Sequence, residues 1–447
     1  MRRLLALAAG LVAAAPAHGQ SGQFDLNKTK TVLTGLINKA ITENGVPSIQ
    51  IALVKGDSVV WTAAFGYSNV RMKVPATTET YYSTGSTFKS ATATAIMQLV
   101  EQGKLKLDDP VNRYLGDDRV QDQLQVEKPV TFRHILSHRS GLLAGANTKP
   151  IWGRELPKPL DKMVSGLYSV RPPEQKYEYN NYAYGMAGLL IEKISGVEYE
   201  KYMYENVIKP LGIKTEHFVR PTPEMVELMA LPYNAGGAGK PPTPVEQVHF
   251  DVYPAGDIWL RAEEMARFLG AHLNGGVWQG KRIISEASVK TAHEAPYGGN
   301  YAFGWGVRKD PKSGHTIIAH TGGIPGMSSN MVGDVDAKVG VYYMSNSGAP
   351  GSIADAAIAL DAKALDRYVG SYQLNPDLSI VVAREANGLV FRANGQGQAT
   401  ELLAESATRF FVKGQGFTVE FVSNAAGEVE KLVIESDGEK QEAKKTK

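Results

Sequence analysis

The chain has 447 residues, with 48 Lys and Arg against 46 Asp and Glu, and 43% of its residues are hydrophobic. This near-neutral charge gives no electrostatic reason to expect nucleic acid or an anionic membrane surface as a partner. The absence of cysteine excludes disulfides, thiolate metal ligands, a thiol nucleophile and a lipid anchor on cysteine. A chain of this length is expected to form one large domain and a smaller one.

Residues 1–19 have the pattern of a signal peptide. Arg2 and Arg3 precede an apolar run from Leu4 to Ala15, and small residues follow the run. The run is too short to span a bilayer, and no second long apolar stretch occurs later in the sequence. We therefore expect an exported protein, periplasmic or secreted, that has no membrane span.

The segment before residue 104 has clear periodicities. Leu26 to Asn44 has a helical pattern, and Ser48 to Lys55 and Ser58 to Trp61 read as two strands joined by a tight turn. Thr87 to Glu101 is rich in small residues on every face, which predicts a helix packed closely all round. Gly103 is a plausible end for that helix.

The middle of the chain, from about residue 104 to 300, reads as mostly helical with long loops, for example at Leu160–Tyr168, Tyr182–Ile194 and Glu263–Leu273. Period-two patterns return at His315–His320 and Val339–Ser345, which we expect to be strands. The sheet is therefore predicted to be built from both ends of a first domain, residues 24–362.

The tail, residues 363–447, changes character. After a short predicted helix near Ile353–Leu360, alternating strands are expected at Leu378–Ala383, Leu389–Ala393, Arg409–Lys413, Phe417–Val422 and Lys431–Glu435. We interpret the tail as a small all-β domain, a barrel or sandwich, and as a candidate surface for homo-oligomer formation. Glu439–Lys447 is predicted to be a solvated, disordered end.

Ser86 and Lys89 lie three positions apart, which on a helix brings a hydroxyl and an amine onto one face. Near the N-terminus of a buried helix, Ser86 would have free backbone N–H groups and the positive end of the helix dipole beside it. Burial of Lys89 would lower its pKa and make the amine a usable base. Chance gives about one such pair in a chain of this composition, so the spacing alone does not establish catalysis.

Four motifs, of which the Ser86 and Lys89 pair forms part of the first, together resemble those of a known family. Gly85–Ser90 resembles the first motif of class C β-lactamases, D-alanyl-D-alanine carboxypeptidases, D-aminopeptidases and related esterases. Thr131–Leu142 is similar to the long helical signature of these proteins, Tyr177–Gly185 to their Tyr-x-Asn motif, and His320–Gly323 to their third box. The resemblance implies an α/β fold with an antiparallel sheet sandwiched by helices, a helical subdomain, and the small all-β domain at the end.

The resemblance implies roles for two residues of the Tyr-x-Asn motif. Tyr179 would be the phenol that faces Ser86 and Lys89, and Asn181 the amide that orients Lys89 and a substrate carbonyl. Free Tyr and Lys side chains both titrate near 10, so each needs the other to act near neutral pH. Which of the two takes the serine proton stays open at this point.

The third box carries His320 where the β-lactamases commonly have Lys, whereas related peptidases and esterases often have His. The resemblance therefore favours a peptidase or esterase. It implies that His320 donates a hydrogen bond to a substrate carboxylate or carbonyl, with Thr321 and Gly322 in the same substrate-binding set. The backbone N–H of Gly323 would join that of Ser86 in an oxyanion hole. The two glycines would let the substrate lie along the strand edge.

Other sites are excluded by missing elements. His134 and His138 have a metal-compatible spacing on the predicted helix, but Ile135 replaces the Glu of a zinc-protease motif, so we interpret them as a structural pair. Phe88 stands where a phosphate loop requires Gly, which rules out a nucleotide site there. The chain has no Gly-x-Ser-x-Gly elbow. We expect no metal and no organic cofactor, because the serine chemistry requires neither.

The sequence therefore predicts a serine hydrolase that forms an acyl-enzyme on Ser86. Its expected substrate is a small acyl compound, either a peptide that contains D-amino acids or a short acyl ester. One alternative is a β-lactamase that acts on β-lactam antibiotics. A second, non-enzymatic alternative is a sensor that binds penicillins or cell-wall peptides and forms a dead-end acyl-enzyme or none.

Overall fold

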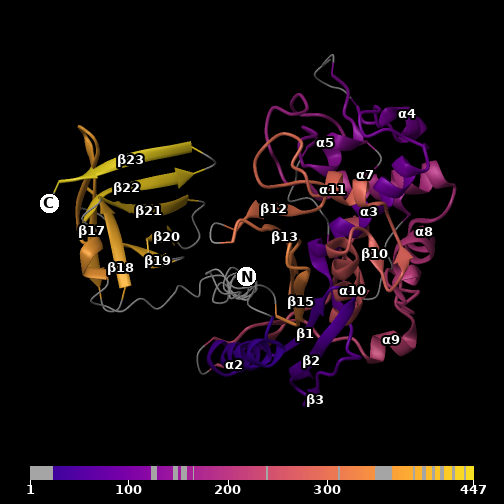
Figure 1. Cartoon of the computed structure of the whole chain (residues 1–447), viewed down its shortest axis with the longest axis horizontal. Coiled ribbons are helices and arrows are strands. Elements are labelled where there is room, and N and C mark those ends of the chain that lie inside the picture. Colours follow the sequence, from indigo (N-terminus) through magenta and orange to yellow (C-terminus); the bar gives the residue numbers. More distant parts are fainter. Residues whose placement is uncertain are drawn as a thin grey trace. The chain divides into compact units, whose positions relative to one another are not determined.

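The computed structural model describes most of the chain and divides it at residue 350 into two compact units (Figure 1). The described residues are 24–446 without 122–127, 144–149, 153–158, 165, 238–239, 311–312, 348–364, 386–387, 395–398, 405–407, 413–416, 425–427 and 437–438. The expected signal peptide and the helix near Ile353–Leu360 lie outside the described residues. The expected boundary at 362/363 falls in or next to the segment 348–364 and stays a prediction.

The first unit is built on a seven-stranded sheet in the order β12-β13-β14-β15-β1-β2-β3. Each strand runs antiparallel to its neighbours. The hairpin near the N-terminus pairs with the last strand of the unit, with Ile49 opposite Ser345, which confirms that both ends of the domain build the sheet. The strands are β1 (Ser48–Lys55), β2 (Ser58–Asn69), β3 (Val74–Pro75), β12 (Gly306–Lys309), β13 (Thr316–Ile324), β14 (Met327–Asp334) and β15 (Val339–Ser345).

Strand β14 was not predicted. All eight of its residues are buried, so its sequence lacks the alternation that marks a half-exposed strand. One cause of this burial is the helix α10 (Ala262–Leu273), which packs directly on the sheet. A Cβ atom at Gly333 would lie 2.8 Å from the Leu273 side chain, and one at Gly340 would lie 2.6 Å from that of Leu269. Glycines in the strands therefore let the helix approach closely.

Two helices, α3 (Lys89–Glu101) and α7 (Asn181–Ser195), pack against each other in the helical part of the unit (Figure 1). In α3 every residue from Lys89 to Leu99 is buried, which confirms the expectation of a helix packed all round. The helix α7 begins at the N-cap Asn180. The other helices are α2 (Leu26–Asn44), α4 (Asn112–Leu115), α5 (Phe132–Leu136), α6 (Leu160–Val164), α8 (Tyr199–Met203), α9 (Pro223–Glu227) and α11 (Glu286–Ala292).

Short two-stranded ladders fasten the loops between these helices. One of them pairs Tyr82–Ser83 with Trp259–Leu260, and so brings the segment before Ser86 beside the loop at residues 253–257. The short strands are β4 (Tyr82–Ser83), β5 (Pro150–Trp152), β6 (Tyr233–Asn234), β7 (Thr243–Pro244), β8 (Val248–Phe250), β9 (Trp259–Leu260), β10 (Val277–Trp278) and β11 (Lys281–Arg282).

Two helix predictions need correction. The predicted helix Leu160–Tyr168 is described only as the five-residue α6. The motif Thr131–Leu142 is helical only at α5, because His138 (φ 57°) and Gly141 (φ 65°) have left-handed backbones that end the helix. His134 and His138 therefore do not share a helix face. His134 instead accepts a hydrogen bond from the Thr131 backbone N–H (3.1 Å) and contacts Glu174 (2.9 Å).

The second unit is a closed eight-stranded barrel with its own apolar core, which includes Tyr372, Leu389 and Leu432. The predicted disordered end is wrong for Glu439–Lys445, which forms the last strand. This strand pairs with both the preceding strand and the first one, and its Ala443 is buried between the exposed Glu442 and Lys444. The strands are β16 (Gly370–Asn375), β17 (Leu378–Glu385), β18 (Gly388–Ala393), β19 (Thr400–Ala404), β20 (Arg409–Val412), β21 (Phe417–Ser423), β22 (Val429–Ser436) and β23 (Glu439–Lys445).

In the part of the chain that is described, no helix is both long enough and apolar enough to cross a membrane.

Candidate active site

Ser86 lies in a tight 3₁₀ turn, Gly85–Phe88, that leads directly into α3. Thr87 fixes this turn. Its hydroxyl donates to the Thr84 carbonyl (2.7 Å) and contacts the Tyr342 hydroxyl on β15 (2.7 Å). These contacts are buried, whereas Ser86 itself is partly exposed. The serine is thus fixed at the start of a buried helix, with its hydroxyl reachable.

Lys89 has no exposed surface, and its Nζ atom lies 2.9 Å from the Ser86 Oγ. The Nζ also donates to the carbonyl oxygen of Ala255 (2.7 Å), in the loop that β9 fastens beside the nucleophile. No carboxylate pairs with Lys89 among the described residues, so no opposite charge compensates its charged form for the loss of water. Burial therefore holds the pKa of Lys89 well below its usual value.

Tyr179 lies over the same amine, with the Lys89 Nζ 4.8 Å from its ring centroid. Loss of water around the phenol raises the pKa of Tyr179 above its usual value, although 39% of the residue is exposed, and the Ser86 hydroxyl opposes this shift. The segment is fixed by Asn180, which caps α7 by accepting from the Ala183 N–H (3.2 Å). The two pKa shifts have opposite directions: the lysine is favoured as a neutral amine and the tyrosine as a neutral phenol.

Asn181 and Ser86 line one pocket of about 80 Å³, together with Asp257 and Gly323. Two buried acceptor atoms at this pocket have no hydrogen-bond partner, the Oδ1 of Asn181 and the Oδ1 of Asp257. The hydrogen-bond acceptor that the structure gives Lys89 beside Ser86 is thus the Ala255 carbonyl, and not the Asn181 amide that the resemblance implied. Neither Ala255 nor Asp257 was predicted, because a loop residue about 170 positions from Ser86 carries no local signal.

Glycines bring the strand β13 and the nucleophile turn into contact. A Cβ atom at Gly85, whose φ is 51°, would lie 2.4 Å from the backbone nitrogen of Gly323. A Cβ atom at Gly256, whose φ is 142°, would lie 2.2 Å from the Gly85 carbonyl oxygen. Side chains at these positions would force the segments apart. Ser86 and Gly323 therefore line the same small pocket. That their backbone N–H groups form an oxyanion hole stays a prediction.

His320, on β13, has both ring nitrogens engaged within the protein. Its Nδ1–H donates to the Thr321 carbonyl oxygen (2.7 Å), and its Nε2 accepts from the Tyr301 hydroxyl (2.9 Å). Burial, together with the charge of Lys89, lowers the pKa of His320 to about 3, against the opposing effect of the Thr321 carbonyl. His320 is thus a neutral ring without a free donor, whereas the sequence predicted a donor for the substrate.

An aromatic group surrounds the buried His138, which the sequence singled out only as half of a histidine pair. The ring centroid of His138 lies 4.3 Å from that of Tyr179, 4.8 Å from Tyr301 and 5.2 Å from Tyr184. Its Nδ1 accepts from the Asn180 backbone N–H (3.1 Å), so it also holds the Tyr179 segment in place. Burial keeps the pKa of His138 well below its usual value. The neutral ring of His138 therefore packs against the ring of Tyr179.

The low pKa of His320 predicts a dependence of stability on pH. Unfolded His titrates near 6.5, whereas His320 in the fold titrates at about 3. Between these values the unfolded chain binds a proton that the folded chain does not, so the free energy of unfolding falls as the pH is lowered. His320→Gln removes this contribution. We expect the slope of unfolding free energy against pH, from pH 6 to 4.5, to become shallower by up to about 1.4 kcal/mol per pH unit.

Urea unfolding monitored by tryptophan fluorescence measures this slope. The matched control is His217→Gln, because His217 is an exposed histidine of the same unit. The control should keep the slope of the unmodified protein. Equal slopes for His320→Gln and the unmodified protein would show that His320 takes up a proton in the folded state.

Comparison with known proteins gives matches over most of the chain. A family model described as Beta-lactamase matches residues 33–366, and one described as Domain of unknown function (DUF3471) matches residues 354–445. Penicillin-binding protein 4* of Bacillus subtilis (strain 168) is 27% identical over 444 residues, which cover 89% of this chain and 94% of that protein.

Solved structures show the same fold. The octameric penicillin-binding protein homologue from Pyrococcus abyssi is 22% identical with a TM-score of 0.58, covering 94% of this chain and 100% of its own. The D-amino acid amidase from Ochrobactrum anthropi SV3 is 22% identical with a TM-score of 0.58, covering 71% of this chain and 91% of its own.

Proposed function

The chain belongs to the beta-lactamase family of serine hydrolases, and on that premise we propose that Ser86 forms an acyl-enzyme with small amide or ester substrates, foremost peptides or amides of D-amino acids. The observation that carries the proposal is the contact between the Ser86 Oγ and the Lys89 Nζ at 2.9 Å, in which the amine is fully buried and has no acidic partner. A neutral amine in this position can accept the serine proton.

The opposite pKa shifts of Lys89 and Tyr179 assign the base role to Lys89 and the acid role to Tyr179. Lys89, whose pKa is lowered, takes the proton of Ser86 as its oxygen bonds to the substrate carbonyl carbon. Tyr179, whose pKa is raised, keeps its proton and can give it to the leaving nitrogen or oxygen when the scissile bond breaks. Reprotonation of Tyr179 by Lys89 returns both groups to their starting state. Water then attacks the ester of Ser86: the neutral Lys89 accepts a proton from this water and gives it to the Ser86 oxygen as the acyl bond breaks, which releases the acid.

The oxyanion of each tetrahedral intermediate is assigned to the backbone N–H groups of Ser86 and Gly323. Both residues line the small pocket, and the helix α3 begins there with its positive dipole end. Losing one such donor in other enzymes typically costs about a hundredfold or more in kcat. This arrangement serves amides, esters and lactams alike, so it does not select the substrate.

One edge of the strand β13 favours a peptide or amide substrate. The strand β12 pairs with residues 316–319 of β13. Residues His320–Ile324 of β13 therefore pair with β14 on one edge and are not covered by β12 on the other. A peptide can add to the opposite edge as an extra strand. The neutral His320 offers no cation for the carboxylate of a β-lactam, which disfavours a dedicated β-lactamase.

A parallel kinetic panel tests the proposal. We expect D-alanine p-nitroanilide to be hydrolysed at least about tenfold faster, in kcat/KM, than its L-isomer, a selectivity of about 1.4 kcal/mol. p-Nitrophenyl acetate should turn over, and a chromogenic cephalosporin should turn over more slowly than the D-anilide. A preference for the L-isomer, or rapid turnover of the cephalosporin alone, would contradict the D-amino-acid proposal. Ser86→Ala is the matched blank for every substrate.

We also propose that the protein is exported and forms a homo-oligomer. The pattern of residues 1–19 supports export to the periplasm or the medium. The Pyrococcus abyssi homologue is described as octameric, which supports a homo-oligomer, with the C-terminal barrel as its contact surface. The near-neutral charge supports a small-molecule substrate over nucleic acid.

A further inference from the structure

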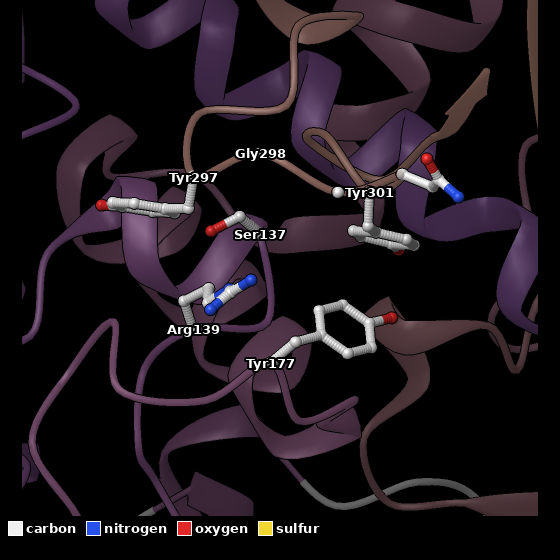
Figure 2. A pocket seen from close by; sticks show the side chains of 8 residues that line it. Ser137, Arg139, Tyr177, Tyr297, Gly298 and Tyr301 are labelled. Carbon is white, nitrogen blue, oxygen red and sulfur yellow. The ribbon is translucent and has the colours of Figure 1, made fainter. Parts of the chain in front are cut away.

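A second pocket, of about 370 Å³, lies beside the aromatic group around His138. Its walls include the rings of Tyr177, Tyr297 and Tyr301, and its one charged residue is Arg139. Figure 2 shows the Arg139 side chain extending into the space between these rings. None of these residues has a role in the chemistry assigned to Ser86.

Arg139 carries a charge that no carboxylate neutralises among the described residues. Its side chain donates a hydrogen bond from Nη1 to the backbone carbonyl of Glu174 (3.2 Å). The carboxylate of Glu174 is instead engaged by Lys128 (2.6 Å) and His134 (2.9 Å). Two nearby arginines in the chain, Arg133 and Arg171, are paired with carboxylates, those of Asp108 and Glu178. Most of the guanidinium donors of Arg139 are therefore available to a ligand.

The position of Arg139 is set by the backbone. Its N–H donates to the His134 carbonyl (2.9 Å), and its carbonyl accepts from the Glu174 N–H (2.8 Å). Tyr297, on the facing wall, stacks on the His134 ring with centroids 5.8 Å apart. Cation and walls are therefore held before any ligand arrives, which limits the entropy cost of binding.

The pocket adjoins the reacting groups through shared rings. Tyr301, one of its walls, donates to the Nε2 of His320 (2.9 Å) and lies 6.4 Å, between centroids, from Tyr179. Tyr177, another wall, is two residues from Tyr179 and 5.8 Å from Tyr301 between centroids. The pocket therefore lies next to the rings that surround Tyr179, close to the groups assigned to the reaction.

We propose that this pocket binds a carboxylate carried by the substrate, with Arg139 as the cation and the tyrosine rings as the walls around the adjoining carbon atoms. The inference rests on the proposed hydrolase function and names a substrate class for it: acyl compounds with a free carboxylate. Arginine suits this task because its planar donors match the two oxygens of a carboxylate.

Matched ester pairs test the proposal on the full chain. The first pair is 4-nitrophenyl hydrogen glutarate, with a free carboxylate on the acyl side, and its neutral methyl ester. The second pair is the acetate of 3-carboxy-4-nitrophenol, with a carboxylate on the leaving group, and 4-nitrophenyl acetate. In each pair the ratio of kcat/KM for the anionic ester to that for the neutral ester is compared between the unmodified protein and Arg139→Gln.

We expect Arg139→Gln to lower this ratio by about tenfold in one pair, mainly through KM, because a charge-assisted hydrogen bond is lost. The pair affected shows on which side of the scissile bond the carboxylate lies. Arg139→Lys should retain part of the preference, since it keeps the charge without the planar fork. Arg308→Gln, at an exposed position on β12, is the matched control and should leave both ratios unchanged. Unchanged ratios in both pairs for Arg139→Gln would overturn the proposal.

A binding measurement separates this inference from the proposed function. Glutaric acid monoanilide, which has the same free carboxylate, is titrated calorimetrically into Ser86→Ala and into Ser86→Ala with Arg139→Gln. Binding about tenfold tighter to the first protein supports the pocket even if no ester turns over, an outcome that would refute only the hydrolase proposal. Equal affinities, with esters hydrolysed normally, would refute only the pocket.

Discussion

Replacing Lys89 with methionine is expected to lower kcat for acyl transfer by about three to four orders of magnitude, while the melting temperature stays the same or rises. The catalytic loss follows because the Ser86 Oγ would lose the amine at 2.9 Å that takes its proton. The stability is retained because methionine fills nearly the same volume and removes an amine that is fully buried without an acidic partner.

The measurement compares steady-state kinetics and thermal unfolding for Lys89→Met and Lys104→Met. Lys104 is exposed shortly after the end of α3, so its replacement should change neither quantity. The rise of kcat/KM with pH should also disappear in Lys89→Met, because the lowered pKa of Lys89 sets it. A kcat within about tenfold of the unmodified protein would remove Lys89 from the mechanism. A loss of activity that accompanies a fall in melting temperature would assign it a structural role.

Elements with a strong local pattern could be predicted from the sequence. The helix Leu26–Asn44 and the strands Ser48–Lys55 and Val339–Ser345 have the bounds that periodicity indicates. The strand Met327–Asp334 escaped prediction because both of its faces are buried, the sheet neighbours and α10 contributing to this. This burial results from tertiary packing, so the strand lacks the alternation of apolar and polar residues by which a sequence indicates a strand.

Charge misled the prediction at the end of the chain. Glu439–Lys445 is almost entirely charged or polar, a composition typical of a solvated tail. In the barrel Gln441, Glu442 and Lys444 are exposed, whereas the small Ala443 is buried. Closure of the barrel pairs this strand on both edges, which favours its order.

Within the candidate site, the predictable part is the local one. The three-residue spacing of Ser86 and Lys89 indicated their contact, and the family motifs supplied Tyr179, Asn181 and Gly323. The Ala255 carbonyl that accepts from Lys89 comes from a distant loop and depends on the β4 and β9 pairing. No residue type marks a backbone acceptor in advance, so only the fold reveals it.

His320 and His138 show the limits of motif transfer. A histidine in the third box indicates a donor for substrate, but whether its N–H is free depends on its neighbours, here Thr321 and Tyr301. His138 reads as a helix-face partner of His134 until the left-handed backbone at residue 138 turns it toward Tyr179. In both cases packing and backbone conformation decide the role.

The central claim is that Ser86 is the acylated nucleophile, and Ser86→Ala is expected to lower kcat by about four orders of magnitude or more. Its neighbours provide internal controls: Ser83 and Ser90 are buried on either side, and the Ser90 hydroxyl donates to the Thr87 carbonyl (2.7 Å). Ser86 alone of the three is partly exposed and contacts Lys89. A reagent that acylates or phosphonylates an activated serine should therefore select it.

The most direct test is intact-protein mass spectrometry after treatment with a fluorophosphonate and, separately, with a penicillin, followed by peptide mapping. We expect one adduct per chain on the peptide that contains Ser86, and no adduct in Ser86→Ala. Rapid loss of the penicillin adduct would indicate turnover, whereas its persistence without hydrolysis of any ester or amide would favour the sensor. An unmodified protein, or the same adduct in Ser86→Ala, would contradict the claim that Ser86 is the nucleophile.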